Sequence, residues 1–448
     1  MVRELCIIGF GISGIACLRW AKEYNIDAIV FEKNSTFGGC WHTSSYKSAI
    51  LQTRKNSYSF SDMPMPDSFN NYPTRDEILQ YLEKYIDFHN LNQDVYYNQE
   101  ISNIFYNNST ELWEIDIQNT KSLKFYKVKS KYIAICSGFY SKPNIIDLPI
   151  KNSFNGKIFH SKEFSFTGQY DYSIFKDKKV VLIGNGPTGC DLSCAAVENG
   201  AKSVTLLYKT DRWILNRYFL NIELDFLMSR FFINLALKLP TSLFLAIFYV
   251  IYLIPRLYYK IYYKLPNSKI NRNNVAVNEC LFPYISEKKI VYKKGIIKSV
   301  DKNTIILEDN SAIDTDLIVM CTGFKQGTHF FDDFNLNILY KRIVPIDYPK
   351  CGFIGFAPSF NWVQNSDLQS RWFLNWIKND KKVSRKTMIR EIIKTHKKHN
   401  ELNVEYFDLS YTPIQYLDDL SKDLNIDIEK NYFDYKYWLK APAYNYWS

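Results

Sequence analysis

The sequence predicts an α/β fold that contains two parallel sheets, and three observations lead to this prediction. A glycine-rich turn from Gly9 to Gly14, with the sequence GFGISG, follows an apolar run and precedes a helix-like segment. A second turn from Gly184 to Gly189, with the sequence GNGPTG, has the same surroundings. Elsewhere, apolar strand-like runs alternate with helical patterns. Strands that are joined by helical crossovers form parallel sheets.

Both turns have the G-x-G-x-x-G spacing of a Rossmann-like dinucleotide-binding fold. Glycines at these positions permit a tight turn, let the backbone approach a diphosphate and let the helix pack on the strand. The N-terminus of the helix also favours phosphate charge. The sequence therefore predicts two dinucleotide sites. The alternative for each turn is an ordinary strand-to-helix loop that happens to be rich in glycine.

The first unit begins with a predicted strand over residues 4–8, a helix over 13–24 and a second strand over 28–31. Glu32 follows that second strand, about twenty residues after the turn, where a carboxylate accepts hydrogen bonds from ribose hydroxyls. A proline-containing loop comes next, and a helix is predicted over residues 74–89. Thr74 and Glu77 have the spacing of a capping box at its start.

Two further strands complete the predicted order of the first unit. They cover residues 112–118 and 132–136, and the second strand ends at Ser137 and Gly138. Alternation of apolar and polar residues indicates a half-buried strand for the first, and a continuous apolar run indicates a buried strand for the second.

The second unit repeats the pattern of the first. Strands are predicted over residues 179–183 and 204–208, and Lys209 follows the second of them. A late apolar strand over residues 317–321 stops at Thr322 and Gly323. We expect chain from both sides of the second unit to complete the first sheet, so that the first domain is discontinuous. A chain of 448 residues exceeds what one core usually serves, and the expected domains are 1–165 with 301–448, and 175–300.

An apolar segment over residues 219–265 interrupts this order. Its uncharged part, residues 239–255, is shorter than the about 20 residues that a bilayer span needs, so a full span is not expected. Two interpretations stay open. The segment is either a helical insert that covers a site or a patch that contacts a membrane surface peripherally.

Composition restricts the class of protein and its partners. The net charge is +10, but the lysines are scattered along the chain, so no nucleic-acid partner is expected. The nine cysteines include no CxxC pair, which indicates a reducing compartment. We therefore expect a cytoplasmic protein, with or without membrane association, and the N-terminus has no pattern of a secretory signal. The six histidines show no metal-site spacing, so no metal is expected.

Several ordered motifs resemble those of the flavin-containing monooxygenases. They are FGGCW at 37–41, FSDMPMP at 60–66, the 154–164 segment with Phe154, Gly156, His160 and Phe164, CTGF at 321–324, and SDLQSRW at 366–372. The 154–164 segment is similar to the FxGxxxHxxx(Y/F) sequence that identifies this family. The resemblance extends from residue 5 to roughly residue 430 of the chain.

This resemblance implies FAD in the first domain and NADPH in the second. The implied enzyme is an FAD-dependent NADPH monooxygenase of the N,N-dimethylaniline monooxygenase type. It transfers one oxygen atom from O₂ to a soft nitrogen or sulfur nucleophile through a flavin C4a-hydroperoxide. The implied partners are therefore a small-molecule amine or thioether and O₂. Such chemistry is carried out by the cofactors, while the protein positions them and excludes water.

The resemblance also implies roles for particular residues. Lys209 occupies the position of the family's arginine for the 2′-phosphate, which favours NADPH over NADH, although lysine offers a point charge rather than a fork. The implied FAD-binding residues are Gly9, Phe10, Gly11, Ile12, Ser13, Gly14, Glu32, Lys33, Gly39, Cys40, Trp41, Leu51, Gln52 and Thr53. The implied NADPH-binding residues are Gly184, Gly186, Thr188, Gly189, Cys190, Asp191 and Lys209, and Thr322 and Gly323 complete the set of cofactor-binding residues.

Gln52 is the catalytic candidate. Animal-type members of the family usually place an asparagine beside the flavin at this position, whereas plant-type members carry glutamine. The side-chain amide of Gln52 can donate a hydrogen bond to oxygen bound at the flavin and contact the nicotinamide. The alternative is a loop glutamine that faces solvent.

Two other functions stay open at this point. A Baeyer-Villiger oxygenase uses the same cofactors, but its motif normally has tryptophan followed by proline or aspartate where this chain has Phe164 and Ser165. A non-catalytic flavoprotein that binds NADPH would also need both turns. A pyridine nucleotide-disulfide reductase needs a redox cysteine pair beside the flavin, and the sequence shows none.

Overall fold

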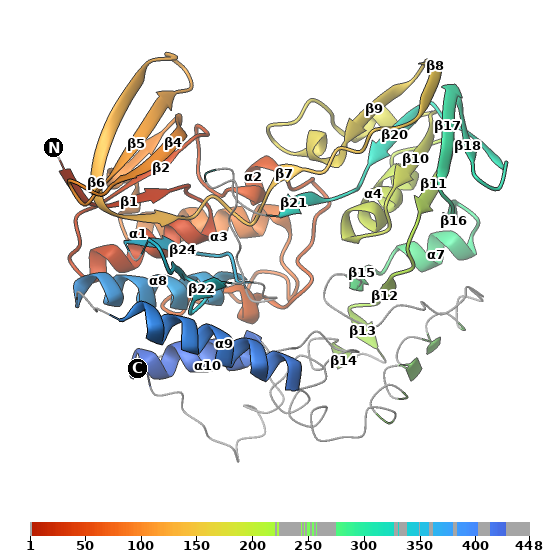
Figure 1. Cartoon of the computed structure of the whole chain (residues 1–448). Helices are drawn as coiled ribbons and strands as arrows, with labels where there is room; N and C mark the ends of the chain where they lie inside the picture. Colours follow the sequence, from red (N-terminus) through yellow and green to blue (C-terminus); the bar gives the residue numbers. More distant parts are fainter. Residues whose placement is uncertain are drawn as a thin grey trace.

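The computed structural model shows one mixed sheet and one parallel sheet, which are connected by two crossing segments of the chain (Figure 1). It describes residues 2–219, 222–223, 275–326, 338–348, 350–357, 362–379, 383–401 and 413–426, together with residues 243, 246, 249–250, 253–254, 257 and 330. The α/β class that the sequence predicts is confirmed.

The first sheet has the strand order β3-β2-β1-β6-β5-β4, and β24 also pairs with β6. The neighbours of β1, which are β2 and β6, run parallel to it, whereas β4, β5 and β6 form an antiparallel extension. The strands are β1 (Val2–Ile8), β2 (Ala28–Glu32), β3 (Val95–Tyr97), β4 (Gln99–Asn107), β5 (Leu112–Asn119), β6 (Phe125–Ile135) and β24 (Cys351–Phe353).

Strand β24 comes from a part of the chain that follows the second sheet. It pairs in parallel with the last residues of β6, from Ile133 to Ile135, while the first residues of β6 pair with β5. The expected discontinuity of the first unit is therefore confirmed.

The second sheet is parallel throughout, with the order β16-β11-β10-β20-β9. Its strands are β9 (Lys157–His160), β10 (Lys179–Ile183), β11 (Ser203–Tyr208), β16 (Ile290–Lys294) and β20 (Leu317–Met320). β9 and β20 fall outside the 175–300 range that the sequence suggests for the second domain, yet they pair on one side of β10. The domain limits themselves stay a prediction.

The chain crosses between the two sheets twice. β7 (Tyr140–Pro143) lies on the outward crossing and β21 (Phe324–Gln326) on the return, and the two pair as antiparallel strands. Figure 1 shows this pair between the two sheets. The smaller sheets contain β8 (Ile150–Phe154), β17 (Ile297–Lys302), β18 (Thr304–Leu307) and β19 (Ala312–Asp314); β12 (Trp213–Leu215) and β15 (Val275–Val277); β13 (Tyr218–Phe219) and β14 (Ile222–Glu223); and β22 (Leu339–Tyr340) and β23 (Val344–Pro345).

Each sheet has a helix directly after its glycine-rich turn. These helices are α1 in the first unit and α4 in the second. α3 begins with the predicted capping box, in which Thr74 accepts a hydrogen bond from the N–H of Glu77 and the Glu77 carboxylate bonds back to Thr74. The helices are α1 (Ile12–Glu23), α2 (Cys40–Thr43), α3 (Arg75–Phe88), α4 (Pro187–Glu198), α7 (Leu281–Ser286), α8 (Trp362–Lys378), α9 (Arg385–Glu401) and α10 (Pro413–Asp423), and the 3₁₀ turns are η1 (Lys55–Tyr58), η2 (Leu91–Asp94), η3 (Ser161–Phe164) and η4 (Tyr172–Phe175).

Helix α8 lies parallel to α1 although more than 300 residues separate them. Ser13 contacts Ser366 near the start of both helices. Further along, the Arg371 guanidinium lies over the Trp20 ring, and Lys378 lies over the ring of Tyr24 at the end of α1. The N-termini of α1 and α8 therefore lie at the same end of the first unit.

The predicted apolar insert over residues 219–265 lies almost entirely outside the described residues. Of its inner part, only residues 243, 246, 249–250, 253–254 and 257 are described, and all are helical. Within the part of the chain that the structure describes, no helix is both long enough and apolar enough to cross a bilayer.

Candidate functional site

The first glycine-rich turn is closed so tightly that only glycine fits at its two ends. The N–H of Gly9 donates to the carbonyl of Phe31 at 2.8 Å, and Gly9 has a φ of +98°. A Cβ on Gly14 would lie 1.9 Å from the Gly9 carbonyl oxygen, and one on Gly9 would lie 2.8 Å from that of Cys136. The strand, the turn and helix α1 are therefore in direct backbone contact.

Glu32 is buried at the end of β2, directly beside this turn. Its Oε2 accepts a hydrogen bond from the backbone N–H of Phe10 at 2.7 Å, and its Oε1 accepts from the backbone N–H of Asn34 at 2.9 Å. Burial and the charge of Glu32 raise the pKa of Tyr97 to about 12. The carboxylate thus fixes the turn, and it lies where the sequence predicts a ribose ligand. Lys33, the next residue, is exposed.

Residues 38–41 pack against the first turn. The N–H of Gly38 donates to the Phe10 carbonyl at 3.0 Å, and a Cβ on Gly39 would lie 3.0 Å from the Cα of Gly11. Gly39 precedes α2, on which Cys40 is exposed. The Trp41 indole N–H donates to the hydroxyl of Tyr58 at 3.0 Å. The structure therefore brings two sequence-predicted parts of the site together.

Helix α8 contributes residues that sequence reasoning did not assign to the site. The Ser366 hydroxyl lies 2.9 Å from that of Ser13. A Cβ on Gly355, whose φ is +81°, would lie 2.1 Å from the Ser13 Oγ. Because the N-termini of α1 and α8 lie at the same end, the dipoles of two helices favour an anion there. The SDLQSRW motif at 366–372 was the available signal, but the sequence does not show where it packs.

The loop at residues 51–53 is held from both sides. The N–H of Leu51 donates to the Pro73 carbonyl at 2.8 Å. The ammonium of Lys55, which is buried, donates to three backbone carbonyls, those of Pro66, Asp67 and Phe69, at 2.8 to 3.0 Å. Gln52 is half-buried within this fixed loop. Sequence reasoning did not anticipate the role of Lys55, because its three acceptors lie eleven or more residues away.

Three buried hydroxyl oxygens in the first unit have no hydrogen-bond partner among the described residues. They belong to Thr53, next to Gln52, to Ser57, and to Ser137, whose Cα lies 3.3 Å from where a Cβ on Gly9 would be. A buried polar atom without a partner costs free energy unless a ligand or water satisfies it. A Cβ on Gly138 would meet no atom within 4 Å. The unsatisfied Ser137 hydroxyl and the open space at Gly138, which follow the strand beside the turn, therefore fit a polar ligand there.

The second turn repeats the geometry of the first. A Cβ on Gly189 would lie 1.8 Å from the Gly184 carbonyl oxygen, and one on Gly184 would lie 2.6 Å from that of Cys321. By contrast, a Cβ on Gly186, at the N-terminus of α4, would meet nothing within 4 Å. Asn185 is buried and donates to the Thr210 carbonyl and the Tyr292 hydroxyl. The backbone at Gly186 thus faces open space, as a diphosphate site requires.

Thr322 and Gly323 follow β20 and lie beside the second turn. The Thr322 hydroxyl donates to the carbonyl of Asn144 on the outward crossing. A ring nitrogen of His160, at the end of β9, lies 3.0 Å from the Gly323 carbonyl oxygen. These contacts fix the two crossing segments to the end of the second sheet, and Gly323 itself faces open space.

The remaining predicted residues of the second site differ in their surroundings. Lys209 is exposed directly after β11, and Thr188 lies in the first turn of α4. The Cys190 side chain is fully buried, with its Sγ toward the Asn185 carbonyl, so it supports the turn from inside. Asp191 accepts hydrogen bonds from Tyr46 and Asn278, and burial raises its pKa to about 6.

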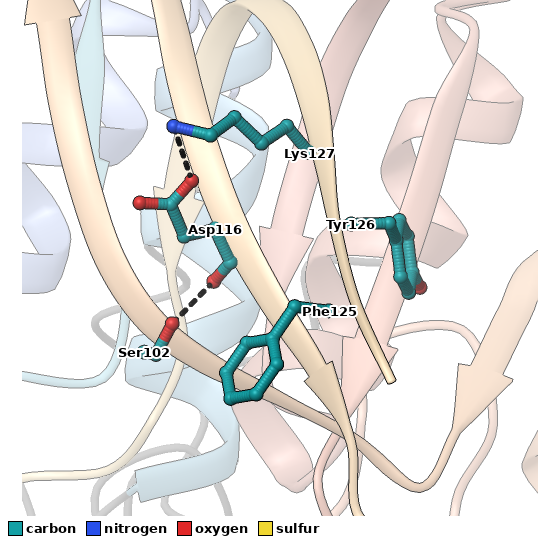
Figure 2. Close-up of a pocket in the computed structure, with 5 residues that line it drawn as sticks. All are labelled: Ser102, Asp116, Phe125, Tyr126 and Lys127. Carbon is teal, nitrogen blue, oxygen red and sulfur yellow. Dashed lines mark hydrogen bonds and ion pairs between the residues drawn. The ribbon is translucent and has the colours of Figure 1, made fainter. Parts of the chain in front are cut away.

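A cavity of about 430 Å³ lies away from both turns. Figure 2 shows it on the antiparallel extension of the first sheet, lined by Ser102, Asp116, Phe125, Tyr126 and Lys127. Lys127 pairs with Asp116 at 3.0 Å, so the charges of the lining already satisfy each other. None of the predicted site residues lines it. Among the described ranges, no cluster of His, Cys, Asp and Glu could hold a metal ion.

Comparison with known proteins finds one matching family model, and the relatives reported below are named as flavin-containing monooxygenases. A family model described as "Flavin-binding monooxygenase-like" matches residues 2–436. Flavin-containing monooxygenase 3 of Macaca mulatta is 26% identical over 95% of this chain and 83% of its own length. Flavin-containing monooxygenase 1 of Mus musculus is 26% identical over 95% of this chain and 84% of its own length.

Two solved structures of low sequence identity have the same fold. A complex of OTEMO with FAD and NADP has a TM-score of 0.72 at 17% identity, and the match covers 94% of this chain and 98% of that one. S-allyl-L-cysteine S-oxygenase from Allium sativum has a TM-score of 0.66 at 17% identity over 98% of this chain and 92% of that one. At these identities the likeness establishes the fold alone.

The same substitution at two glycines of the second turn should have different effects, on stability at Gly189 and on NADP⁺ binding at Gly186. Gly189→Ala should lower the free energy of unfolding by more than about 2 kcal/mol, because its Cβ would overlap the Gly184 carbonyl. Gly186→Ala should cost less than about 1 kcal/mol, yet weaken NADP⁺ binding, because its methyl group enters the open space. Urea denaturation of the ligand-free chain and calorimetric titration with NADP⁺ measure the two effects. Equal stability losses for both variants would contradict this assignment.

Proposed function

The chain belongs to the flavin-binding monooxygenase-like family, and we propose that it is an NADPH- and O₂-dependent monooxygenase acting on a soft nucleophile. The substrate class proposed is a small-molecule amine or thioether, which receives one oxygen atom of O₂ at nitrogen or sulfur. The observation that carries the proposal is the pair of glycine turns of like geometry, one at each of the two larger sheets of a chain that the family model matches almost from end to end.

FAD is proposed to lie at the first turn. The backbone from Gly9 to Gly14 and the N-termini of α1 and α8 would hold its diphosphate, and Glu32 its ribose. Cys40, Trp41 and the loop at residues 51–53 would line the ring system. The unsatisfied hydroxyl of Thr53 and the open space at Gly138 support this placement. Bound FAD accepts a hydride from NADPH and supplies the oxygen-activating chemistry.

NADPH is proposed to lie at the second turn. The N-terminus of α4 would hold the diphosphate at Gly186, where the backbone faces open space. Lys209 follows β11 at the same edge of the sheet as the turn, and its ammonium would pair with the 2′-phosphate. This charge is the reason to propose NADPH rather than NADH.

Gln52 is proposed to act at the reacting oxygen. Its loop is fixed by the Leu51 hydrogen bond and by Lys55, so the backbone that carries the Gln52 amide is held in place. An amide N–H donated from a fixed position stabilises charge that develops during oxygen transfer. It also helps to exclude water, since a wet site releases hydrogen peroxide instead of oxygenated product.

We further propose that the segment over residues 219–265 contacts a membrane surface. Its described residues Leu243, Val250, Ile254 and Leu257 are helical and exposed. Every charged residue from 226 to 278 is Lys or Arg. Exposed apolar residues in a stretch of sequence whose charges are all basic are typical of peripheral binding to anionic lipid.

The purified protein, reconstituted with FAD, should be yellow and should oxidise NADPH in the presence of O₂ and an amine or thioether. Product mass should show one added oxygen atom at nitrogen or sulfur. Lactones formed from cyclic ketones instead would indicate Baeyer-Villiger chemistry. Flavin reduction by NADPH without any oxygenated product would indicate a non-catalytic NADPH-binding flavoprotein.

Replacing Gln52 should uncouple NADPH oxidation from oxygen transfer. Gln52→Ala is expected to lower the yield of oxygenated product per NADPH by roughly tenfold, with a matching rise in hydrogen peroxide, because a fixed donor is lost. Gln52→Asn keeps the amide and serves as the control, with a smaller effect. Peroxide assays beside product quantification measure both, and unchanged coupling in Gln52→Ala removes Gln52 from the site.

Membrane contact should depend on both lipid charge and the exposed apolar residues of the segment. The protein should float with vesicles of anionic phospholipid and stay unbound with vesicles of phosphatidylcholine alone. Val250→Glu with Leu257→Glu should abolish flotation, whereas Val291→Glu, which changes an exposed apolar residue of β16, should not. A wild-type protein that remains unbound to anionic vesicles would refute the proposal.

A further inference from the structure

A segment of the first unit is built into the core of the second. Tyr46 and Ala49 are buried in the apolar cluster that contains Val180, Leu206 and Cys190 of the second unit. Between them, the backbone N–H of Ser48 donates to the hydroxyl of Tyr172 at 3.0 Å. Residues 46–49 therefore form a fixed connection between the two units.

Tyr46 ends in a hydrogen bond to a carboxylate of helix α4. Its hydroxyl donates to Asp191 Oδ2 at 2.6 Å, and the Asn278 amide donates to Asp191 Oδ1 at 2.6 Å. Asn278 is oriented for this, because its own Oδ1 accepts from the N–H of Leu281 at 2.7 Å. The two carboxylate oxygens of Asp191 thus each receive a donor from a different segment of the chain.

The hydrogen bond between Tyr46 and Asp191 joins two elements that are proposed to hold different cofactors. Tyr46 lies between Trp41 and Gln52, which are both proposed to line the flavin. Asp191 lies one turn into α4, whose N-terminus is proposed to hold the NADPH diphosphate. One short hydrogen bond therefore ties the flavin-lining stretch to the NADPH-binding helix.

We propose that Tyr46 and Asp191 are a pair of positioning residues that sets the distance between the two cofactors. The inference rests on the proposed function. Hydride transfer needs the reacting atoms within about 3–3.5 Å, and a misplacement of about 1 Å can lower the rate by two orders of magnitude. The pair touches neither reacting atom and acts by fixing the elements that carry them.

The test compares two tyrosines that each donate to a carboxylate of α4. Tyr46→Phe removes the donor to Asp191, and Tyr284→Phe removes the donor to Glu198, which lies 3.1 Å from the Tyr284 hydroxyl at the far end of the same helix. In FAD-reconstituted protein, the limiting rate of anaerobic flavin reduction by NADPH should fall roughly tenfold in Tyr46→Phe. The Kd of NADPH should change by less than about threefold, because Tyr46 is not among the residues proposed to hold NADPH. Tyr284→Phe should match the wild type in both.

Asp191→Ala provides a second variant. It removes both acceptor oxygens, so it should slow reduction by a similar factor, and the double variant should be no slower than either single one. A limiting rate in Tyr46→Phe equal to that of the wild type overturns the proposal. So does an effect confined to the Kd, or single effects that multiply in the double variant.

Hydrogen exchange of the cofactor-free chain gives a readout that does not need turnover. In Tyr46→Phe the amides of residues 44–51 and of the first turns of α4 should both exchange at least roughly tenfold faster than in Tyr284→Phe, because each element loses its partner. Unchanged exchange in either element overturns the proposal. If NADPH fails to reduce the wild-type flavin, the proposed function fails, while the exchange comparison still decides whether the pair links the two elements.

Discussion

The contact between a glycine Cα and a carbonyl oxygen is the constraint on which both sites depend. Gly14 lies against Gly9, and Gly189 against Gly184, so closely that a methyl group at Gly14 or Gly189 would overlap the backbone. This contact lets each helix start directly at the end of its strand, with its first N–H groups pointing outward. Because the same arrangement occurs in both sheets, the chain repeats the turn geometry that favours an anion at a helix N-terminus.

The two sites differ in how much of the fold supports them. At the first turn, α8 lies parallel to α1, and the backbone around Gly39 closes against Gly11. At the second turn, the support comes from the hydrogen bond of Asn185 to Tyr292 of β16 and from Cys321 at the end of β20. The flavin of this monooxygenase family is proposed at the more enclosed turn, which suits a cofactor that stays bound and needs water excluded. The more open turn suits a cofactor that must exchange.

Polar contacts between distant segments hold the loop of Gln52 and helix α4 in place. Lys55 fixes the loop of Gln52 through three carbonyls, and Tyr46 reaches from the same stretch to Asp191 on α4. A buried ammonium and a buried carboxylate are stable only when hydrogen bonds satisfy them. Losing those hydrogen bonds would cost free energy, so each segment has one favoured position. A reaction between two bound cofactors requires such fixed positions.

The sequence by itself determined the α/β class, both glycine turns, the strands and helices that flank them, the Thr74 capping box and the family. These features depend on the spacing of glycines, the periodicity of apolar residues and helix capping. Each of these patterns lies within a short stretch of chain, so the local sequence suffices to predict it. The tertiary structure alone decided that β24 joins β6, that α8 lies on α1, that Lys55 reaches three carbonyls and that Tyr46 meets Asp191. Most of these contacts join segments that are distant in the chain, and all depend on burial and on the path of the folded backbone, which no local pattern records.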